Sequence, residues 1–484
     1  MKISKLKNKT KISFLHILLS NLLGTISGVL QKLLIVKYLV PSDYGILVYF
    51  NTLVSLINTS VDLGANNGAL FLSTREKINL NQVNINKYIS QYIIFTFIMC
   101  SVCSICILFY KSFLEENLVI YLFISIIIMA NCLNNTYQII CRVDDKFKII
   151  AFSGIISSFV GIIITILLVS FAENDQKIIN VIAIQTIIVI LPLMWYKYKV
   201  KFNFIFLFDF GLIKMLIKIG MPLTIIPILT AFLSGIDKII LIKYLNENEY
   251  GIYALASTLG SILLMIPNSL APILNQKFIS DESDIKSINI NTVREKILYI
   301  NIYMCFLAGL AVTALPIILK SIFVKYATGI EIINNMILAN LMIVTVPIMW
   351  GYLMSKKEKL KLINGIILII ISEIFAIILY YKENGASGIE NLIVIFNSME
   401  FILFLSITNK YIKINLHEIF CIFMPLTVTL IYTKVVNYNQ MVDYANNGDR
   451  INNAVIIFLI YSVLLYVIFK YIKPKYFGAN KKND

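Results

Sequence analysis

The 484-residue sequence is poor in charge and has almost no histidine. Charged side chains make up 14% of it and hydrophobic ones 58%, whereas soluble domains contain about 25% charged and 45–50% apolar residues. Such an excess of apolar side chains cannot be hidden from water in one compact core, which excludes a soluble globular protein. Because His16 and His417 are the only histidines, we expect no metal site and no cofactor.

The sequence also lacks the motifs of nucleotide-driven and disulfide-stabilised proteins. No Gly-x-x-x-x-Gly-Lys-Ser/Thr motif is present, so direct coupling to ATP hydrolysis is not expected. The seven cysteines lie mostly inside apolar runs without metal-ligand partners. The spacing of Cys100, Cys103 and Cys106 places them on one helix face, where small polarisable side chains serve packing.

Long apolar runs account for most of the chain. A helix that crosses the hydrocarbon core needs about 20 apolar residues, and fourteen candidate segments meet this need: 12–36, 46–72, 88–110, 117–141, 148–171, 178–195, 211–242, 250–274, 296–319, 328–353, 360–381, 387–407, 416–433 and 453–472. We therefore predict an all-α polytopic membrane protein with about 14 transmembrane helices. The lysine-rich start resembles a signal peptide but has no small-residue cleavage site, so we expect a retained first helix.

The basic residues indicate the orientation of these helices. With an even number of spans, 31 of the 42 Lys and Arg residues lie on the side of both termini. Short loops rich in Lys and Arg stay in the cytoplasm, so both termini are predicted to be cytoplasmic. The net charge of +15 thus reflects membrane topology, and no nucleic-acid partner is expected.

One segment of the sequence occurs twice. Residues 31–46 recur as residues 237–252, with seven of sixteen positions identical, among them Lys32/Lys238, Tyr44/Tyr250 and Gly45/Gly251. Six predicted spans separate the copies, so both copies have the same orientation, which indicates a parallel repeat about an axis along the membrane normal. We predict two six-helix lobes related by a pseudo-two-fold axis, residues 1–205 and 206–409, and two additional helices with a basic tail, residues 410–484.

Short motifs in and near the two copies resemble a known family. The residues are Tyr38-Leu39-x-Pro41-x-Asp43-Tyr44-Gly45, Asp62-Leu63-Gly64, Gly220-x-Pro222-Leu223, and Asp237-Lys238 ahead of Tyr250-Gly251. The chain is similar to the polysaccharide flippases of the multidrug/oligosaccharidyl-lipid/polysaccharide exporter superfamily, which include O-antigen and capsule repeat-unit translocases. The resemblance implies that an undecaprenyl-pyrophosphate-linked oligosaccharide crosses the bacterial plasma (inner) membrane by alternating access, for O-antigen, lipopolysaccharide or capsule synthesis.

Other functions stay open at this point. A cation-coupled multidrug exporter of the same superfamily is expected to have twelve spans and acidic cavity residues, and a peptidoglycan-precursor flippase differs only in its substrate. A polytopic polymerase or glycosyltransferase needs a sizeable outer loop with catalytic groups, whereas no outer loop here exceeds about twenty residues, so we expect no enzyme. The expected partners are the lipid-linked substrate, the bilayer, a coupling H⁺ or Na⁺, and the polymerase machinery.

Two lysines occupy matching positions near the outer ends of the first and seventh predicted helices. Lys32 and Lys238 would face each other across the pseudo-two-fold axis and bind the pyrophosphate. Alternatively, each long side chain reaches the membrane surface while its stem stays in lipid. Asp237 is either a gating residue or a local charge partner of Lys238.

A carboxylate lies deeper in the second predicted helix. Charges inside a membrane are costly and often functional, so Asp62 is predicted to be a coupling site or a latch between the lobes, and Asn67 to contact substrate. The repeat offset pairs Asp62 with Asn268, which is also predicted to line the cavity. In the alternative interpretation, Gly64 and Gly68 allow close helix packing, with Asp62 hydrogen-bonded or paired to a lysine at that contact.

The remaining candidates are two acids and two amides. Glu373 and Glu400 are single acids in apolar surroundings of the second lobe, where they would bind a coupling cation or have a structural role. Asn134 and Asn135 belong to a polar stretch, residues 131–138, that would line a sugar pathway or join helices.

Overall fold

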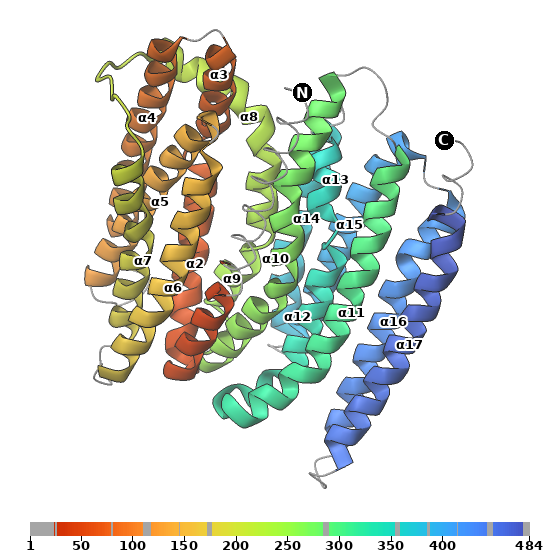
Figure 1. Ribbon diagram of the computed structural model, residues 1–484. Helices are drawn as coiled ribbons and strands as arrows, with labels where there is room; N and C mark the ends of the chain where they lie inside the picture. The colour runs from red at the N-terminus through yellow and green to blue at the C-terminus, as the bar shows by residue number, and fades with distance from the viewer. Residues whose placement is uncertain are drawn as a thin grey trace. The chain divides into compact units, whose positions relative to one another are not determined.

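The computed structural model consists of helices and contains no strand among the residues that it describes. Those residues are 24 and 27–477, apart from gaps at 79–80, 110–117, 145, 172–176, 284–289, 354–358, 385–387, 414 and 443–448. A helical segment, 27–38, precedes α2. The predicted all-α membrane fold is confirmed (Figure 1).

The helices are long and follow one another with short connections. Their bounds are α2 Pro41–Ser60, α3 Ala65–Ile78, α4 Gln82–Phe109, α5 Leu118–Val143, α6 Phe147–Phe171, α7 Lys177–Lys199, α8 Phe210–Leu233, α9 Ile236–Leu241, α10 Glu247–Ser283, α11 Ile290–Ile322, η3 Val324–Gly329, α12 Ile330–Met342, α13 Val346–Leu353, α14 Lys359–Asn384, α15 Ile389–Ile412, α16 Leu416–Val442 and α17 Asp449–Phe477.

Eleven helical stretches of the described chain are long and apolar enough to cross a membrane, and the bent pair α2 and α3 makes a twelfth. Most of the first predicted span lies outside the described residues. The last predicted span lies within α17, whose apolar stretch among the described residues is Ile456–Lys470. The total of fourteen therefore stays a prediction.

The chain divides into two compact units, Met1–Ile239 and Ile240–Asp484. The predicted lobe boundary, after residue 205, lies before α8. The first unit instead includes α8, which packs against α3. The duplicated segments share one backbone hydrogen bond, since Leu39 N–H donates to Ile35 and Leu245 N–H to Leu241. They differ in helix length: the first copy is helical to residue 38, whereas α9 ends at Leu241 and turns follow it.

Helix starts and breaks follow from the sequence. Pro41 begins α2, because its fixed φ and missing N–H suit the first helical position. The second predicted span, 46–72, therefore begins five residues earlier than expected, at Pro41. Asp209 caps α8 by accepting a hydrogen bond from the Leu212 N–H at 3.1 Å.

The second unit is built around α12, whose described residues are nearly all buried. Two of its amides pair with neighbouring helices: Asn334 donates to Asn437 of α16 at 2.6 Å, and Asn335 donates to Glu390 of α15 at 3.5 Å. The Tyr461 hydroxyl of α17 donates to the Cys305 carbonyl of α11 at 2.6 Å. These buried polar contacts join α16 and α17 to α11 and α12.

Candidate functional site: a polar cavity in the first unit

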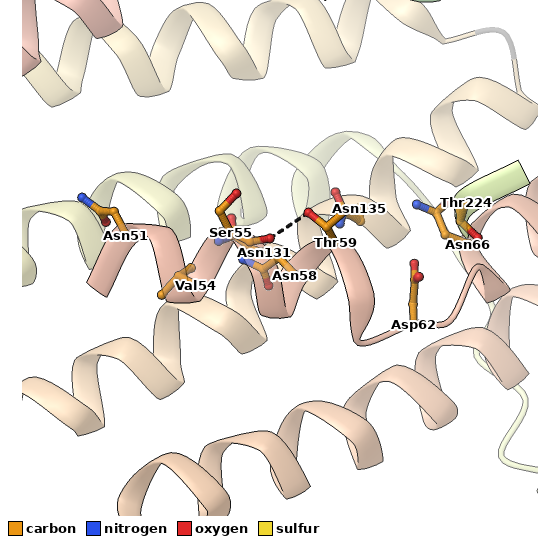
Figure 2. A pocket seen from close by; sticks show the side chains of 10 residues that line it. All are labelled: Asn51, Val54, Ser55, Asn58, Thr59, Asp62, Asn66, Asn131, Asn135 and Thr224. Carbon is orange, nitrogen blue, oxygen red and sulfur yellow. Dashed lines mark hydrogen bonds between the residues drawn. The ribbon is translucent and has the colours of Figure 1, made fainter. Parts of the chain in front are cut away.

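A cavity of about 530 Å³ lies within the first unit and is lined by α2, α3, α5 and α8. Its lining side chains are five amides, three hydroxyls, one carboxylate and one valine: Asn51, Asn58, Asn66, Asn131, Asn135, Ser55, Thr59, Thr224, Asp62 and Val54 (Figure 2). None of these lining residues is basic or aromatic. The site thus offers hydrogen-bonding groups with a single formal charge.

The largest contribution to the cavity comes from α2. Asn51, Ser55 and Asn58 are spaced by four and three residues, so they share one helix face, and Figure 2 shows them in a row along α2. The Asn58 Oδ1 atom is buried and has no hydrogen-bond partner. An unsatisfied buried acceptor is costly, and rotation of the Asn58 amide toward a ligand hydroxyl or amide N–H in the cavity would remove that cost.

The α5 helix supplies two further amides one turn apart. Asn131 and Asn135 line the cavity, whereas the Asn134 side chain donates to the Val189 carbonyl of α7 at 2.8 Å. The polar stretch is therefore divided between two environments: Asn135 faces the cavity, while Asn134 joins two helices. Contact of either side chain with a sugar stays a prediction.

Asp62 lies at the break between α2 and α3. Its carboxylate accepts a hydrogen bond from the Gly64 N–H at 3.0 Å, and the Asn66 backbone also donates to it. Leu63 and Gly64 have positive φ values of 46° and 86°, so the chain leaves the helical path here and bends by 43°. A carboxylate at a helix N-terminus is stabilised by free N–H groups and by the helix dipole.

The break is held by a close contact of α3 with α8. A Cβ atom on Gly68 would lie 2.1 Å from the Leu216 carbonyl oxygen, and one on Gly220 would lie 1.8 Å from the Gly64 carbonyl oxygen. The two backbones therefore touch, as the glycine spacing predicted. Asp62 lies beside this tight helix contact and also lines the cavity. Its position is therefore compatible with the packing interpretation and with the coupling interpretation, and its coupling role stays a prediction.

The predicted lysines do not line this cavity. Lys32 is exposed on the helical segment 27–38. The Lys238 ammonium lies 3.1 Å from Asp237 and donates to the Ser234 carbonyl at 2.7 Å. The local charge pair considered for Asp237 is thus present, and a pyrophosphate site at these lysines stays a prediction.

The other candidates lie outside the cavity lining. Asn67 is half-buried next to Asn66, which takes the lining position, and Asn268 is exposed on α10. No break separates α10 where the repeat matches the α2–α3 break, so the second copy is one helix there. Glu373 and Glu400 are buried in α14 and α15 of the second unit, where a coupling role stays a prediction.

Sequence reasoning missed most of the α2 face. A signal was present, because Asn51, Ser55, Asn58 and Asp62 recur at helical spacing in a mainly apolar run. Thr224, by contrast, is not part of a set of polar residues at helical spacing. Its hydroxyl donates to the Gly220 carbonyl at 3.1 Å and reaches the cavity because α8 lies against α3.

The fold and the polar cavity define a multi-pass membrane transporter or flippase. The chain belongs to a family of polysaccharide biosynthesis proteins, whose sequence model matches residues 34–333. A comparison with curated protein sequences found no match.

Solved structures of two transporter groups share the fold. The lipid II flippase MurJ in an inward closed conformation has a TM-score of 0.64 and 15% identity, over 95% of this chain and 98% of that chain. An inward-facing multidrug resistance MATE transporter has a TM-score of 0.59 and 14% identity, over 81% and 94%. A Vibrio cholerae MATE transporter, VcmN, has a TM-score of 0.59 and 12% identity, over 86% and 99%.

Proposed function

We propose that the protein moves an undecaprenyl-pyrophosphate-linked oligosaccharide from the inner to the outer leaflet of the bacterial plasma membrane, for surface polysaccharide synthesis. Two lobes, predicted from the repeat, would alternate in access, and binding that differs between the two states would shift their populations. The polysaccharide biosynthesis family and the flippase fold support this function.

The observation that carries the proposal is the chemistry of the cavity. Nine of its ten lining side chains are polar, and Asn58 Oδ1 is a buried acceptor without a partner. Sugars present a dense set of hydroxyls and amides, which need such neutral donors and acceptors to replace water. In this mechanism the cavity holds the sugars while the polyprenyl chain stays in lipid.

A multidrug exporter is the second candidate, because MATE transporters share the fold. Sites for small drug-like molecules are predominantly hydrophobic and aromatic. The described cavity has one apolar and no aromatic lining residue. This composition favours a carbohydrate over an apolar organic cation, although Asp62 supplies the acid that an exporter would use.

Deletion of the gene followed by lipid analysis tests the proposal. The flippase function predicts that lipid-linked repeat units accumulate facing the cytoplasm and that surface polymer is lost. Units that reach the outer face but stay unpolymerised would instead indicate a polymerase. Unchanged polymer with increased sensitivity to organic cations would indicate an exporter.

The cavity itself is tested with variants in the deletion strain. Asn58→Ala removes the unpartnered acceptor, so we expect less surface polymer at an unchanged protein level. Ser101→Ala is the control, since this half-buried α4 side chain lies outside the cavity lining and donates to its own helix at Phe97. Normal polymer with Asn58→Ala would exclude this cavity from substrate binding.

A further inference from the structure

The connection between α7 and α8 has an unusual sequence. Residues 201–210 read Lys-Phe-Asn-Phe-Ile-Phe-Leu-Phe-Asp-Phe, with phenylalanine at every second position. Residues 200–209 are not helical, and we call them the phenylalanine segment. Its neighbours are two apolar helices, each long enough to span a membrane, so the segment lies at a membrane face.

The aromatic side chains of this segment are divided between two environments. Phe202 packs against the buried cluster that includes Ile139 and Tyr196. Phe204, Phe206 and Phe208 are instead exposed, with Phe206 at 89% of its full accessible area. Three exposed phenylalanines on ten residues form an apolar surface that needs a partner outside the described chain.

The backbone of the segment is fixed by two side chains of α4 that are themselves fully buried, Ser90 and Gln91. The Ile205 N–H donates to Ser90 Oγ at 2.9 Å, and the Asp209 N–H donates to Gln91 Oε1 at 3.0 Å. Gln91 also donates to the Leu207 carbonyl. These bonds come from alternate residues, and the Leu207 N–H also donates to the Ile205 carbonyl at 3.0 Å, so α4 holds a non-helical chain that makes a tight turn at Phe206.

The charge around the segment is almost entirely positive. Five exposed lysines lie within about one or two helical turns of it: Lys197, Lys199, Lys201, Lys214 and Lys218. Between positions 197 and 218 the one acidic residue is Asp209, whose carboxylate caps α8 and lies 3.8 Å from Lys87. The lysines therefore leave a net positive surface beside the aromatic one.

We propose that the phenylalanine segment is an interfacial anchor that binds anionic phospholipids. Irregular backbone exposed to lipid is not tolerated in the hydrocarbon core, whereas aromatic rings concentrate at the membrane–water interface. Phe204, Phe206 and Phe208 enter the headgroup and upper acyl region, and the lysines bind lipid phosphates. The anchor fixes the depth of the α7–α8 connection through Ser90 and Gln91.

The depth of the segment is measured with one tryptophan. The chain has two tryptophans, so Phe206→Trp in a Trp195→Phe/Trp350→Phe background is the single fluorophore in reconstituted full-length protein. We expect quenching by lipids brominated near the carbonyl and protection from aqueous iodide. Phe159→Trp, on the exposed face of α6, is the deep control. Iodide quenching of Phe206→Trp equal to that of free tryptophan would overturn the proposal.

Lipid charge is tested separately, with spin-labelled phosphatidylglycerol and phosphatidylcholine in vesicles of phosphatidylcholine. We expect Lys199→Gln/Lys201→Gln/Lys214→Gln to lower the preference for phosphatidylglycerol by about fivefold or more at low salt. Lys325→Gln, an exposed lysine of the second unit, should leave it unchanged. An unchanged preference in the triple variant would show that the lysines do not select anionic lipid.

Discussion

Substitutions of Asp62 distinguish its observed role at the helix terminus from its proposed coupling role, because capping and charge respond differently to asparagine and alanine. Asparagine keeps an acceptor oxygen for the Gly64 and Asn66 N–H groups, and Asn and Asp are nearly equal as helix caps. Asp62→Asn should therefore cost only a few tenths of a kcal/mol in unfolding free energy. Asp62→Ala loses both hydrogen bonds and should cost about 1–2 kcal/mol.

Two assays compare these variants with the wild-type protein. Apparent unfolding temperature in detergent reports stability, and surface polymer in the deletion strain reports transport. If the carboxylate charge takes part in transport, Asp62→Asn abolishes polymer while its unfolding temperature stays near the wild-type value. The coupling role would be refuted if Asp62→Asn gave normal surface polymer while Asp62→Ala lowered the unfolding temperature. Asp62 would then serve only to stabilise the helix terminus.

Two further predictions concern packing and the cavity wall. Gly68→Ala and Gly220→Ala each place a Cβ atom against backbone and should lower the unfolding free energy by about 1–3 kcal/mol. Gly28→Ala is the control, because its Cβ atom would have nothing within 4 Å. Thermal unfolding should show this variant unchanged or slightly more stable. Asn135→Ala should lower the amount of surface polymer at normal stability. Asn134→Ala should instead lower the unfolding free energy by about 1 kcal/mol, because its hydrogen bond to the Val189 carbonyl is lost. The opposite pattern would mean that the two side chains have been assigned to the wrong helix faces.

The helices could be predicted from the sequence because hydrophobicity alone decides them. A run of about 20 apolar residues must be helical in lipid, so most of the predicted runs coincide with helices of the described chain. Three of them contain a break that was not predicted: 46–72 after Ser60, 211–242 after Leu233 and 328–353 after Met342. The α2–α3 break was harder to predict. It depends on the αL backbone of Leu63 and Gly64 and on the contact with α8, which lies about 150 residues later in the sequence.

The cavity was predicted in part. Asn135 and Asp62 could be predicted as candidate site residues because polar groups are rare in membrane helices, and both line the cavity. Asn66 and Asn67 are adjacent in the sequence, and only the rotation of α3 decides which one faces inward. Polarity identifies the helix that carries a site, whereas the choice between neighbouring residues needs the packing of that helix.

The central claim is that this protein carries lipid-linked oligosaccharide across a bilayer, and reconstituted vesicles test it most directly. Purified protein is placed in vesicles that contain undecaprenyl-pyrophosphate oligosaccharide in both leaflets, and an impermeant sugar-modifying reagent is added outside. Transport predicts that the reagent consumes the whole lipid pool, and that Asn58→Ala slows the second, inner-leaflet phase. Consumption of the outer-leaflet share alone, as in protein-free vesicles, would contradict the proposed function.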